Sequence, residues 1–470
     1  MDIRKFAAAA AIIMFTGCSQ TATYNGFVFP EQEEGTFTPV SDTYVDTPAE
    51  YTDEGIPDKC LGTYSSDDGI CVINKMEHYY DVTIDYENST PAQAGKAYAD
   101  ALIKAFPNYV EVVEPYLYEN IVIGFPGLKD DYTPVEERIN YMAEQIRPEL
   151  REELYALAEE LSGGVHGFGE DGTISYEEVL QFNLIPETLR GTACSALSLW
   201  GEKTSTGDPV AMRLLDWSPG SEYQMWKIHA VLHAKKGDRS YTGITFLGFE
   251  SIVSAVNDDG VFASILDVGS GTEPFTYNDK KCYTWEIRYA LEEFDTAREL
   301  GQYMVDNSSY FTWSNHTYVT DKNESLCAEN ATQQLQDKNK GFSILRDCNT
   351  PLIESIHWDS KDSLCVVNSF AAKGNQDFFS DGENNIVRFN KYNEWVKARD
   401  KFTVGDIKTM ITREKVNQGK ADGEAVVNNV RHRGTCQIII VDYHTGNIQV
   451  AFSPATGPTD DVVFTDVGHY

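Results

Sequence analysis

The sequence predicts an α+β protein of αββα architecture, in which two antiparallel sheets pack face to face between helical layers. Two observations favour this fold class. Amphipathic helical segments fill the first part of the chain, and strands, two helices and further strands follow them. The chain also has no internal repeat. Separate blocks of helix and strand are typical of layered α+β domains.

Residues 1–18 resemble a bacterial lipoprotein signal peptide. Two basic residues precede an apolar run at 6–15, which is too short to span a bilayer as a helix. Gly17-Cys18 then resembles a lipobox, in which Cys18 is lipidated and becomes the mature N-terminus. The alternative is an ordinary secretory signal with an incidental Cys. A lipobox implies a protein of the bacterial cell envelope that Cys18 anchors to a membrane, and Ser19 favours the outer membrane.

Residues 19–58 are predicted to form an acidic, flexible tether, because they are rich in Thr, Glu and Pro and poor in periodic apolar residues. The whole chain carries 38 Lys and Arg against 73 Asp and Glu, a net charge of −35. Nucleic-acid binding needs a basic surface, so nucleic acid is excluded as a partner. The acidity is typical of an exported protein that stays in solution.

Residues 59–193 are predicted to form a helical segment that precedes the strand-rich part of the chain. An amphipathic helix begins at Thr90 and runs to about residue 105, with Pro at its first position. A second helix begins at Thr133, breaks near residue 148 and resumes. Ser175 and Glu178 form a capping box, which predicts a further helix that leads up to residue 193.

Two apolar runs, 194–200 and 210–216, are predicted to form a β-hairpin, because a polar turn with Gly and Pro separates them. In the expected antiparallel pairing Asp216 lies opposite Cys194, and Arg213 lies opposite Leu197. This hairpin gathers a thiol, a carboxylate and a guanidinium at one end of a sheet. A single Cys is usually a buried structural residue, but these neighbours favour a catalytic thiol.

The rest of the chain is predicted to supply the other strands of the sandwich and its second helical layer. Strands are expected at 227–234, 241–249, 251–256, 261–266, 317–320, 325–329 and 364–368, helices at 284–293 and 296–305, and a final hairpin at 436–442 and 447–452. Asn257 lies in an Asn-Asp-Asp-Gly turn between two of the strands, where a structural role is expected.

The motif around Cys194 resembles that of the N-terminal-nucleophile (Ntn) cysteine hydrolases. A small residue precedes Cys194-Ser195, and Arg213-x-x-Asp216 follows one hairpin later. The resemblance is to the acid ceramidase, N-acylethanolamine amidase and penicillin acyltransferase groups, and more distantly to choloylglycine hydrolases. Ser195 stands where Thr is common, and Leu214 stands where Asn is common. The resemblance implies an αββα catalytic domain at 194–470 and assigns 59–193 to a pro-segment or small subunit.

The resemblance implies a hydrolase of non-peptide amide bonds, or an acyltransferase, that uses a thioester acyl-enzyme and needs no cofactor or metal. Self-cleavage between Ala193 and Cys194 would make Cys194 the N-terminal nucleophile and free its α-amine, whose pKa of roughly 7.7 to 8 suits a general base. Asp216 would orient this amine, and Arg213 would keep Asp216 ionised or contact the substrate. The substrate is expected to be a small acyl amide, with the acyl group and the amine left open.

Two later residues complete the pattern of this family. Asn368 ends a predicted strand and resembles the Asn whose side chain donates to the oxyanion. Arg388 resembles the Arg that follows in the same family. Taken without the resemblance, Asn368 is a turn residue and Arg388 is a surface residue.

Nine cysteines are present, and an exported protein lies in a disulfide-permissive compartment. Cys60 and Cys71 flank a short polar loop and are predicted to form a disulfide. The spacing of the Cys and His residues suits no zinc site. Gly167 and Gly169 stand where an EF-hand-like stretch would need carboxylates, so no calcium site is expected.

Two alternatives to an Ntn hydrolase follow from the same residues. A papain-like protease needs a Gly-Ser-Cys-Trp type of context, whereas Cys194 is followed by Ser-Ala-Leu. A non-catalytic surface lipoprotein would keep the fold and bind a ligand or a partner. An uncleaved mature chain that does not react with thiol reagents would favour this second alternative.

We expect the N-terminal peptide of the mature protein to begin at a lipid-modified Cys18, because Gly-Cys after an apolar run of this length provides a processing site. Mass spectrometry of this peptide checks the expectation. An unmodified Cys18, or processing at another bond, would remove the predicted membrane anchor.

Overall fold

A computed structural model describes most of the chain. The described residues are 50–125, 128, 131–189, 192–236, 239–268, 276–379, 383–414, 416 and 430–470, with a short pair of strands, β1 (Thr23–Tyr24) and β2 (Phe27–Val28). Cys18 and the predicted signal peptide lie outside these residues. No helix in the described ranges has both the length and the apolar character that crossing a bilayer requires.

The first large sheet has seven strands and carries the predicted hairpin at its centre. Its strands, in spatial order, are β16 (Ser363–Val366), β7 (Thr192–Leu199), β8 (Val210–Trp217), β17 (Thr435–Asp442), β18 (Asn447–Phe452), β19 (Thr465–His469) and β3 (Ile56–Pro57). Neighbouring strands are antiparallel except for β19 and β3, which are parallel.

The second large sheet has ten strands. In spatial order they are β15 (Ile344–Arg346), β14 (Ser325–Asn330), β13 (Asn315–Thr320), β12 (Phe262–Asp267), β11 (Ser254–Asn257), β10 (Arg239–Phe246), β9 (His229–Lys236), β6 (Tyr80–Asp85), β5 (Cys71–Met76) and β4 (Cys60–Ser65). The β6–β9 pair is parallel. Both sheets are therefore mixed, which corrects the prediction of two purely antiparallel sheets.

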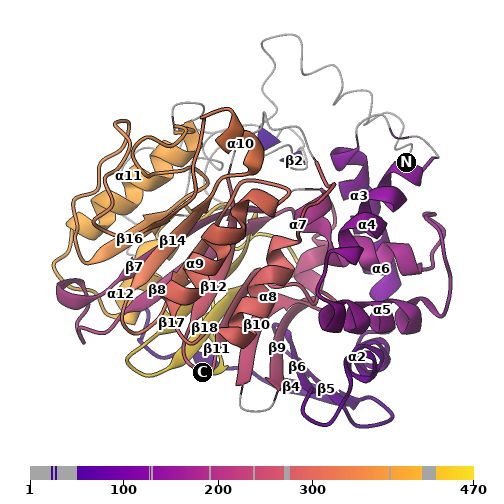
Figure 1. Cartoon of the computed structure of the whole chain (residues 1–470). Coiled ribbons are helices and arrows are strands. Elements are labelled where there is room, and N and C mark those ends of the chain that lie inside the picture. The colour runs from indigo at the N-terminus through magenta and orange to yellow at the C-terminus, as the bar shows by residue number, and fades with distance from the viewer. Residues whose placement is uncertain are drawn as a thin grey trace, which may run out of the picture.

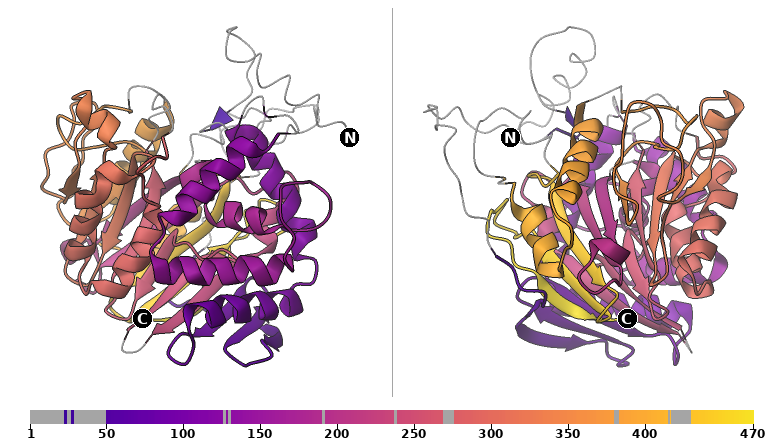
Figure 2. Two further views of the ribbon diagram at one scale, coloured as in Figure 1. Left: turned by 45° about the vertical axis from the view of Figure 1, so that its right-hand side comes forward. Right: turned by 90° about the vertical axis from the view of Figure 1, so that its left-hand side faces the viewer.

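Helices cover the outer face of each sheet. The helices are α2 (Pro91–Ala105), α3 (Tyr109–Gly124), α4 (Thr133–Glu144), α5 (Pro148–Ser162), α6 (Tyr176–Asn183), α7 (Ile185–Thr188), α8 (Tyr283–Glu293), α9 (Ala297–Asn307), α10 (Gln333–Asp337), α11 (Glu383–Lys397) and α12 (Val404–Thr412). Helices α11 and α12 pack on the seven-stranded sheet, and α8 and α9 pack on the ten-stranded sheet. Figure 1 and the right-hand view of Figure 2 show the sheets between these layers, so the predicted αββα architecture is confirmed.

The helices at 91–188 lie together beside the sandwich (Figure 1), and α2 packs on β4 and β5 of the ten-stranded sheet. The predicted caps are present, because Thr90 and Ser175 each form a capping box with the residue three positions later. Helix α2 packs closely along α5: a Cβ at Gly95 would lie 2.1 Å from the carbonyl oxygen of Glu153. Glycine is therefore needed at this crossing.

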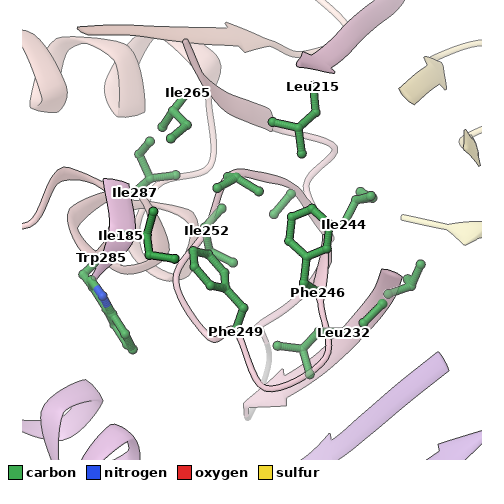
Figure 3. Packing of buried hydrophobic residues seen from close by; sticks show 14 of the residues in the cluster. Ile185, Leu215, Leu232, Ile244, Phe246, Phe249, Ile252, Ile265, Trp285 and Ile287 are labelled. Carbon is green, nitrogen blue, oxygen red and sulfur yellow. The ribbon is translucent and has the colours of Figure 1, made fainter. Parts of the chain in front are cut away.

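The main hydrophobic core fills the space between the sheets and extends under the helical bundle. Figure 3 shows a part of it, where Leu215 of β8 and Ile265 of β12 represent the two sheets. Phe246 and Phe249 stack edge to face with each other and with Trp217. A smaller core lies between the seven-stranded sheet and helices α11 and α12.

The prediction that residues 59–193 are helical is wrong for residues 60–85. This stretch forms β4, β5 and β6, and β6 pairs with β9 from the part of the chain after Cys194. The cause is visible in the side chains, since buried and less buried residues alternate along Tyr80–Asp85 as they do in a half-buried strand. The N-terminal segment and the predicted catalytic domain therefore share one sheet.

The predicted disulfide between Cys60 and Cys71 is contradicted, because both cysteines are free, as are the other cysteines in the described residues. In the β4–β5 hairpin Cys60 pairs with Met76, whereas Cys71 follows directly on the turn. Cys60 therefore lies at the open end of the hairpin and Cys71 at its turn. The strands have six residues each, so the two cysteines are roughly 15 Å apart at the usual rise per residue. A disulfide cannot bridge such a separation.

Glu187 of α7 is fully buried where the segment before Cys194 meets α8. It accepts hydrogen bonds from the backbone N–H of Thr284, at 2.9 Å, and from the Thr284 hydroxyl. Burial raises the pKa of the Glu187 carboxyl from 4.5 to about 7, with the Thr284 hydrogen bonds acting in the opposite direction. The folded chain therefore favours the protonated acid.

We expect Glu187→Gln to flatten the pH dependence of stability. Because the pKa is higher in the folded chain, the stabilisation is complete below about pH 4.5 and is lost as the pH rises through about 7. The free energy of unfolding, measured with urea, should differ between pH 5 and pH 8, and this difference should be smaller in the variant by up to about 3 kcal/mol. Glu152→Gln, on an exposed position of α5, is the control and should behave as wild type. An unchanged pH dependence in Glu187→Gln would contradict the assignment.

Candidate active site

Several strand ends meet at one end of the seven-stranded sheet. Cys194 lies near the start of β7, Asp216 near the end of β8, and Asn368 two residues after β16. Arg388, from α11, reaches the same place. Because β7 runs antiparallel to both β8 and β16, its start lies beside their ends. The sheet topology therefore brings these four residues together.

The observed hairpin differs from the predicted one by one residue. Cys194 faces Leu215, Ala193 faces Asp216, and Ala196 faces Arg213. The ladder ends with the pair Leu199–Val210, and beyond it the turn closes through a hydrogen bond from the N–H of Gly201 to the carbonyl of Gly207, at 2.9 Å.

This shift changes which side chains share a face of the sheet. In an antiparallel pair, residues directly opposite each other point to the same side, and a slip of one residue moves a side chain to the other side. Arg213 therefore shares the face of Cys194, whereas Asp216 shares the face of Ala193. The expectation that Asp216 lies opposite Cys194 is wrong, and Arg213 is the neighbour of the thiol.

The Cys194 thiol is fully buried. The Nη2 group of Arg213 donates to Sγ at 3.0 Å and also to the carbonyl of Ile265, on the opposite sheet, at 3.0 Å. Burial raises the pKa of the Cys194 thiol to about 11, while the positive charge of Arg213 acts in the opposite direction. In the intact chain this thiol is protonated at neutral pH.

The guanidinium of Arg213 has unused donor capacity. Its Nε and Nη1 atoms are buried and have no hydrogen-bond partner among the described residues. Buried donors of this kind are costly unless an acceptor satisfies them. The arrangement beside the thiol can therefore receive an oxygen of a bound molecule.

The backbone of Cys194 is held on both sides. Its N–H donates to Asn368 Oδ1 at 3.0 Å, and its carbonyl oxygen accepts from Arg388 Nη1 at 2.9 Å. Arg388 Nη2 also donates to Asn368 Oδ1 at 2.7 Å, and Asn368 Nδ2 donates to the carbonyl of Asp267 at 2.6 Å. Asn368 thus contacts the backbone nitrogen of Cys194, a contact that sequence reasoning did not predict.

The Asp216 carboxylate is buried among donors from other elements. Oδ1 accepts from the hydroxyl of Thr435 at 2.6 Å, and Oδ2 lies 3.7 Å from Arg388 Nη1 and 3.3 Å from His432 Nε2. The guanidinium in contact with Asp216 is therefore that of Arg388. The predicted contact of Arg213 with Asp216 is not observed, because Arg213 points to the other face of β8.

Sequence reasoning missed three residues of this site. Thr435 and His432 lie where β17 begins, far along the chain from Cys194, and no motif marks them. Asn385 accepts from Arg388 Nη2 at 2.9 Å and donates to the carbonyl of Asn368 at 3.1 Å. Its spacing of three residues from Arg388 on one helix is a signal that could have identified it.

Other predicted features lie outside this site. Asn257 accepts from the N–H of Val261 and donates to the carbonyls of Leu291 and Phe294, which agrees with its expected structural role. The group of potential metal ligands found among the described residues, Asp58, Glu77 and His78, includes no residue of the Cys194 site.

No protein-family model and no curated protein matches the chain. Among solved structures, the Caenorhabditis elegans N-acylethanolamine-hydrolyzing acid amidase ortholog is similar, with 15% identity and a TM-score of 0.36 over 53% of this chain and 92% of that one. A conjugated bile acid hydrolase variant from Clostridium perfringens has 11% identity and a TM-score of 0.29, over 58% of this chain and 92% of that one. Penicillin V acylase from Agrobacterium tumefaciens has 12% identity and a TM-score of 0.29, over 59% of this chain and 78% of that one.

These three structures carry the names of enzyme groups that the Cys194 motif resembles. All the TM-scores are below 0.5, so the overlaps establish neither a substrate nor an activity. What the chain can do must be read from its own side chains.

Proposed function

We propose that the protein is a cysteine amidohydrolase or acyltransferase that acts on the non-peptide amide bond of a small acyl amide, with Cys194 as nucleophile. One observation carries this proposal. A buried thiol lies 3.0 Å from a guanidinium, and its own backbone nitrogen and carbonyl are both held by buried side chains. A purely structural Cys does not need such a set of polar partners. Burying these polar and charged side chains costs free energy, and such arrangements are typical of functional sites.

No general base contacts this thiol among the residues that the structure describes. The α-nitrogen of Cys194 is an amide that donates to Asn368, and an amide nitrogen cannot take a proton from a thiol at neutral pH. Strand β7 begins two residues before Cys194, so the Ala193–Cys194 bond lies within the strand and Ala193 faces Asp216. Cleavage of this bond would remove the residues opposite Asp216 and leave a free α-amine in their place.

The proposed cleavage is intramolecular. Sγ of Cys194 attacks the carbonyl carbon of Ala193 through a five-membered ring, the C–N bond breaks, and the nitrogen takes the thiol proton to become an α-amine. Water then hydrolyses the thioester, which leaves a carboxylate on Ala193 and restores the thiol. Proximity makes the first step feasible. The contacts of Asn368 and Arg388 would hold the Cys194 backbone while the ring forms.

In the proposed turnover the α-amine of Cys194 takes the thiol proton and later gives it to the leaving amine of the substrate. The thiolate attacks the substrate carbonyl and forms a thioester, which water or a second amine then opens. Arg213 would contact the substrate through its unused N–H groups. Asn368 would stabilise the oxyanion, and Asp216, held by Thr435 and Arg388, would orient the amine.

The proposed setting is the bacterial cell envelope, with a lipid anchor on Cys18, and rests on the sequence of residues 1–18. A non-catalytic protein that binds a ligand through the same fold is the second candidate. The full burial of Cys194 favours this candidate if the Ala193–Cys194 bond stays intact, because no substrate reaches a thiol in that state.

We expect purified protein to turn over at least one compound in a panel of N-acyl amino acids, N-acylethanolamines, bile-salt conjugates and penicillins. Cys194→Ala should lose at least about 1,000-fold in kcat/KM and should remain a single chain on a gel. Wild type should give an N-terminal fragment ending at Ala193 and a larger one starting at Cys194. Cys282→Ala, another buried free thiol, is the matched control and should cleave and turn over as wild type.

Two results would refute parts of the proposal separately. Equal turnover by Cys194→Ala and wild type would exclude Cys194 as the nucleophile. A fully active single chain with an intact Ala193–Cys194 bond would exclude the α-amine as the base.

A further inference from the structure

A tight turn lies against Asp216 immediately before β17. It comprises residues 432–435 and is closed by a hydrogen bond from the Thr435 N–H to the His432 carbonyl, at 3.0 Å. The carbonyl of Gly434 accepts from the N–H of Trp217 at 3.1 Å, which fixes the turn to the end of β8. Its position relative to Asp216 is therefore set by the backbone.

The turn presents two side chains to the two oxygens of Asp216. Thr435 donates to Oδ1 at 2.6 Å, and its hydroxyl oxygen in turn accepts from the N–H of His432 at 3.1 Å. His432 Nε2 lies 3.3 Å from Oδ2. All three residues are at most 4% exposed, so water does not compete for these contacts.

The hydrogen bonds of the His432 ring define its tautomer. The N–H of Gly434 donates to His432 Nδ1 at 3.0 Å, so Nδ1 is an acceptor and carries no proton. In a neutral ring the proton is then on Nε2, which is the atom that faces Asp216. The turn thus fixes the direction in which His432 can donate.

We propose that His432 is a positioning residue, which holds the Asp216 carboxylate in place opposite Ala193, at the strand end where cleavage would free the α-amine of Cys194. This inference rests on the proposed function, in which Asp216 orients the freed α-amine. Thr435 hydrogen-bonds Oδ1, and His432 Nε2 and Arg388 Nη1 lie at ion-pair distances of 3.3 and 3.7 Å from Oδ2, without the alignment of a hydrogen bond, so together they favour one orientation of the carboxylate. Arg388 Nη1 donates to the carbonyl of Cys194 and lies 3.7 Å from Asp216 Oδ2, which is too far for a hydrogen bond, whereas His432 Nε2 is closer to that oxygen, at 3.3 Å.

The kinetic test compares His432→Phe, which keeps a ring but has no N–H, with His432→Gln, which keeps a donor near the position of Nε2. We expect His432→Phe to lower kcat by about 100-fold, the usual cost of misplacing a catalytic group by about 1 Å, with KM within about twofold of wild type. His432→Gln should recover most of the kcat.

His229→Phe is the matched control. His229 is also buried, and both of its ring nitrogens have hydrogen-bond partners. Burial lowers the pKa of His229 to about 3, so its ring is neutral. Its loss should lower the melting temperature as much as His432→Phe does, and should leave kcat unchanged. If His432→Phe also leaves kcat unchanged, or if the Gln and Phe variants are equally impaired, the positioning role is wrong.

A second measurement does not depend on turnover. Crystal structures of His432→Phe and His432→Gln, both in a Cys194→Ala background, should show the Asp216 carboxylate rotated in the first and in place in the second. If wild type turns over no substrate, the proposed function fails, but these structures still decide the role of His432. An Asp216 side chain that keeps its orientation in His432→Phe would overturn the inference.

Discussion

The site depends on one buried cation, the guanidinium of Arg388. This group is fully buried and contacts the carbonyl of Cys194, the side-chain oxygens of Asn368 and Asn385, and the carboxylate of Asp216. Removing a guanidinium from water costs free energy, and several acceptors around the buried group are needed to offset this cost. Because the acceptors come from β7, from the segment just after β16, and from the end of β8, the charge of Arg388 holds three parts of the chain in one geometry. The other contacts of the nucleophile follow from this arrangement.

A second guanidinium, that of Arg213, acts on the other face of the same strand pair. Arg213 joins the thiol of Cys194 to the carbonyl of Ile265, and so ties the nucleophile to the opposite sheet. The two cations contact different parts of Cys194: Arg388 holds its backbone, and Arg213 faces its sulfur. Despite this charge, burial keeps the pKa of the thiol at about 11 in the intact chain. The intact state is therefore closed and poorly reactive, which agrees with a chain that needs a cut before it acts.

The sequence was sufficient to identify residues that the fold brings to one site, because Cys194, Arg213 and Asp216 stand in a short motif, and caps such as Thr90 and Ser175 mark the helix starts. It was not sufficient for their pairing. The register is fixed in the turn, which closes through the Gly201 N–H and the Gly207 carbonyl, and the composition of a turn alone does not specify it. Thr435 and His432 went unnoticed because they lie far along the chain from Asp216 and no motif marks them. The alternating burial of strand β6 is a local signal that was missed. Its pairing with β9, which lies far along the chain, leaves no local signal.

The central claim is that the intact strand seals the nucleophile and that cleavage before Cys194 opens it. The most direct test is the rate at which iodoacetamide alkylates each cysteine at pH 8, measured by peptide mass spectrometry before and after cleavage. Exposed Cys60 and buried Cys71 are internal references within the same chain. The account predicts that Cys194 reacts as slowly as Cys71 in the intact chain and faster than Cys60 after cleavage. A Cys194 that reacts as fast as Cys60 in the intact chain, or stays as slow as Cys71 after cleavage, would contradict it.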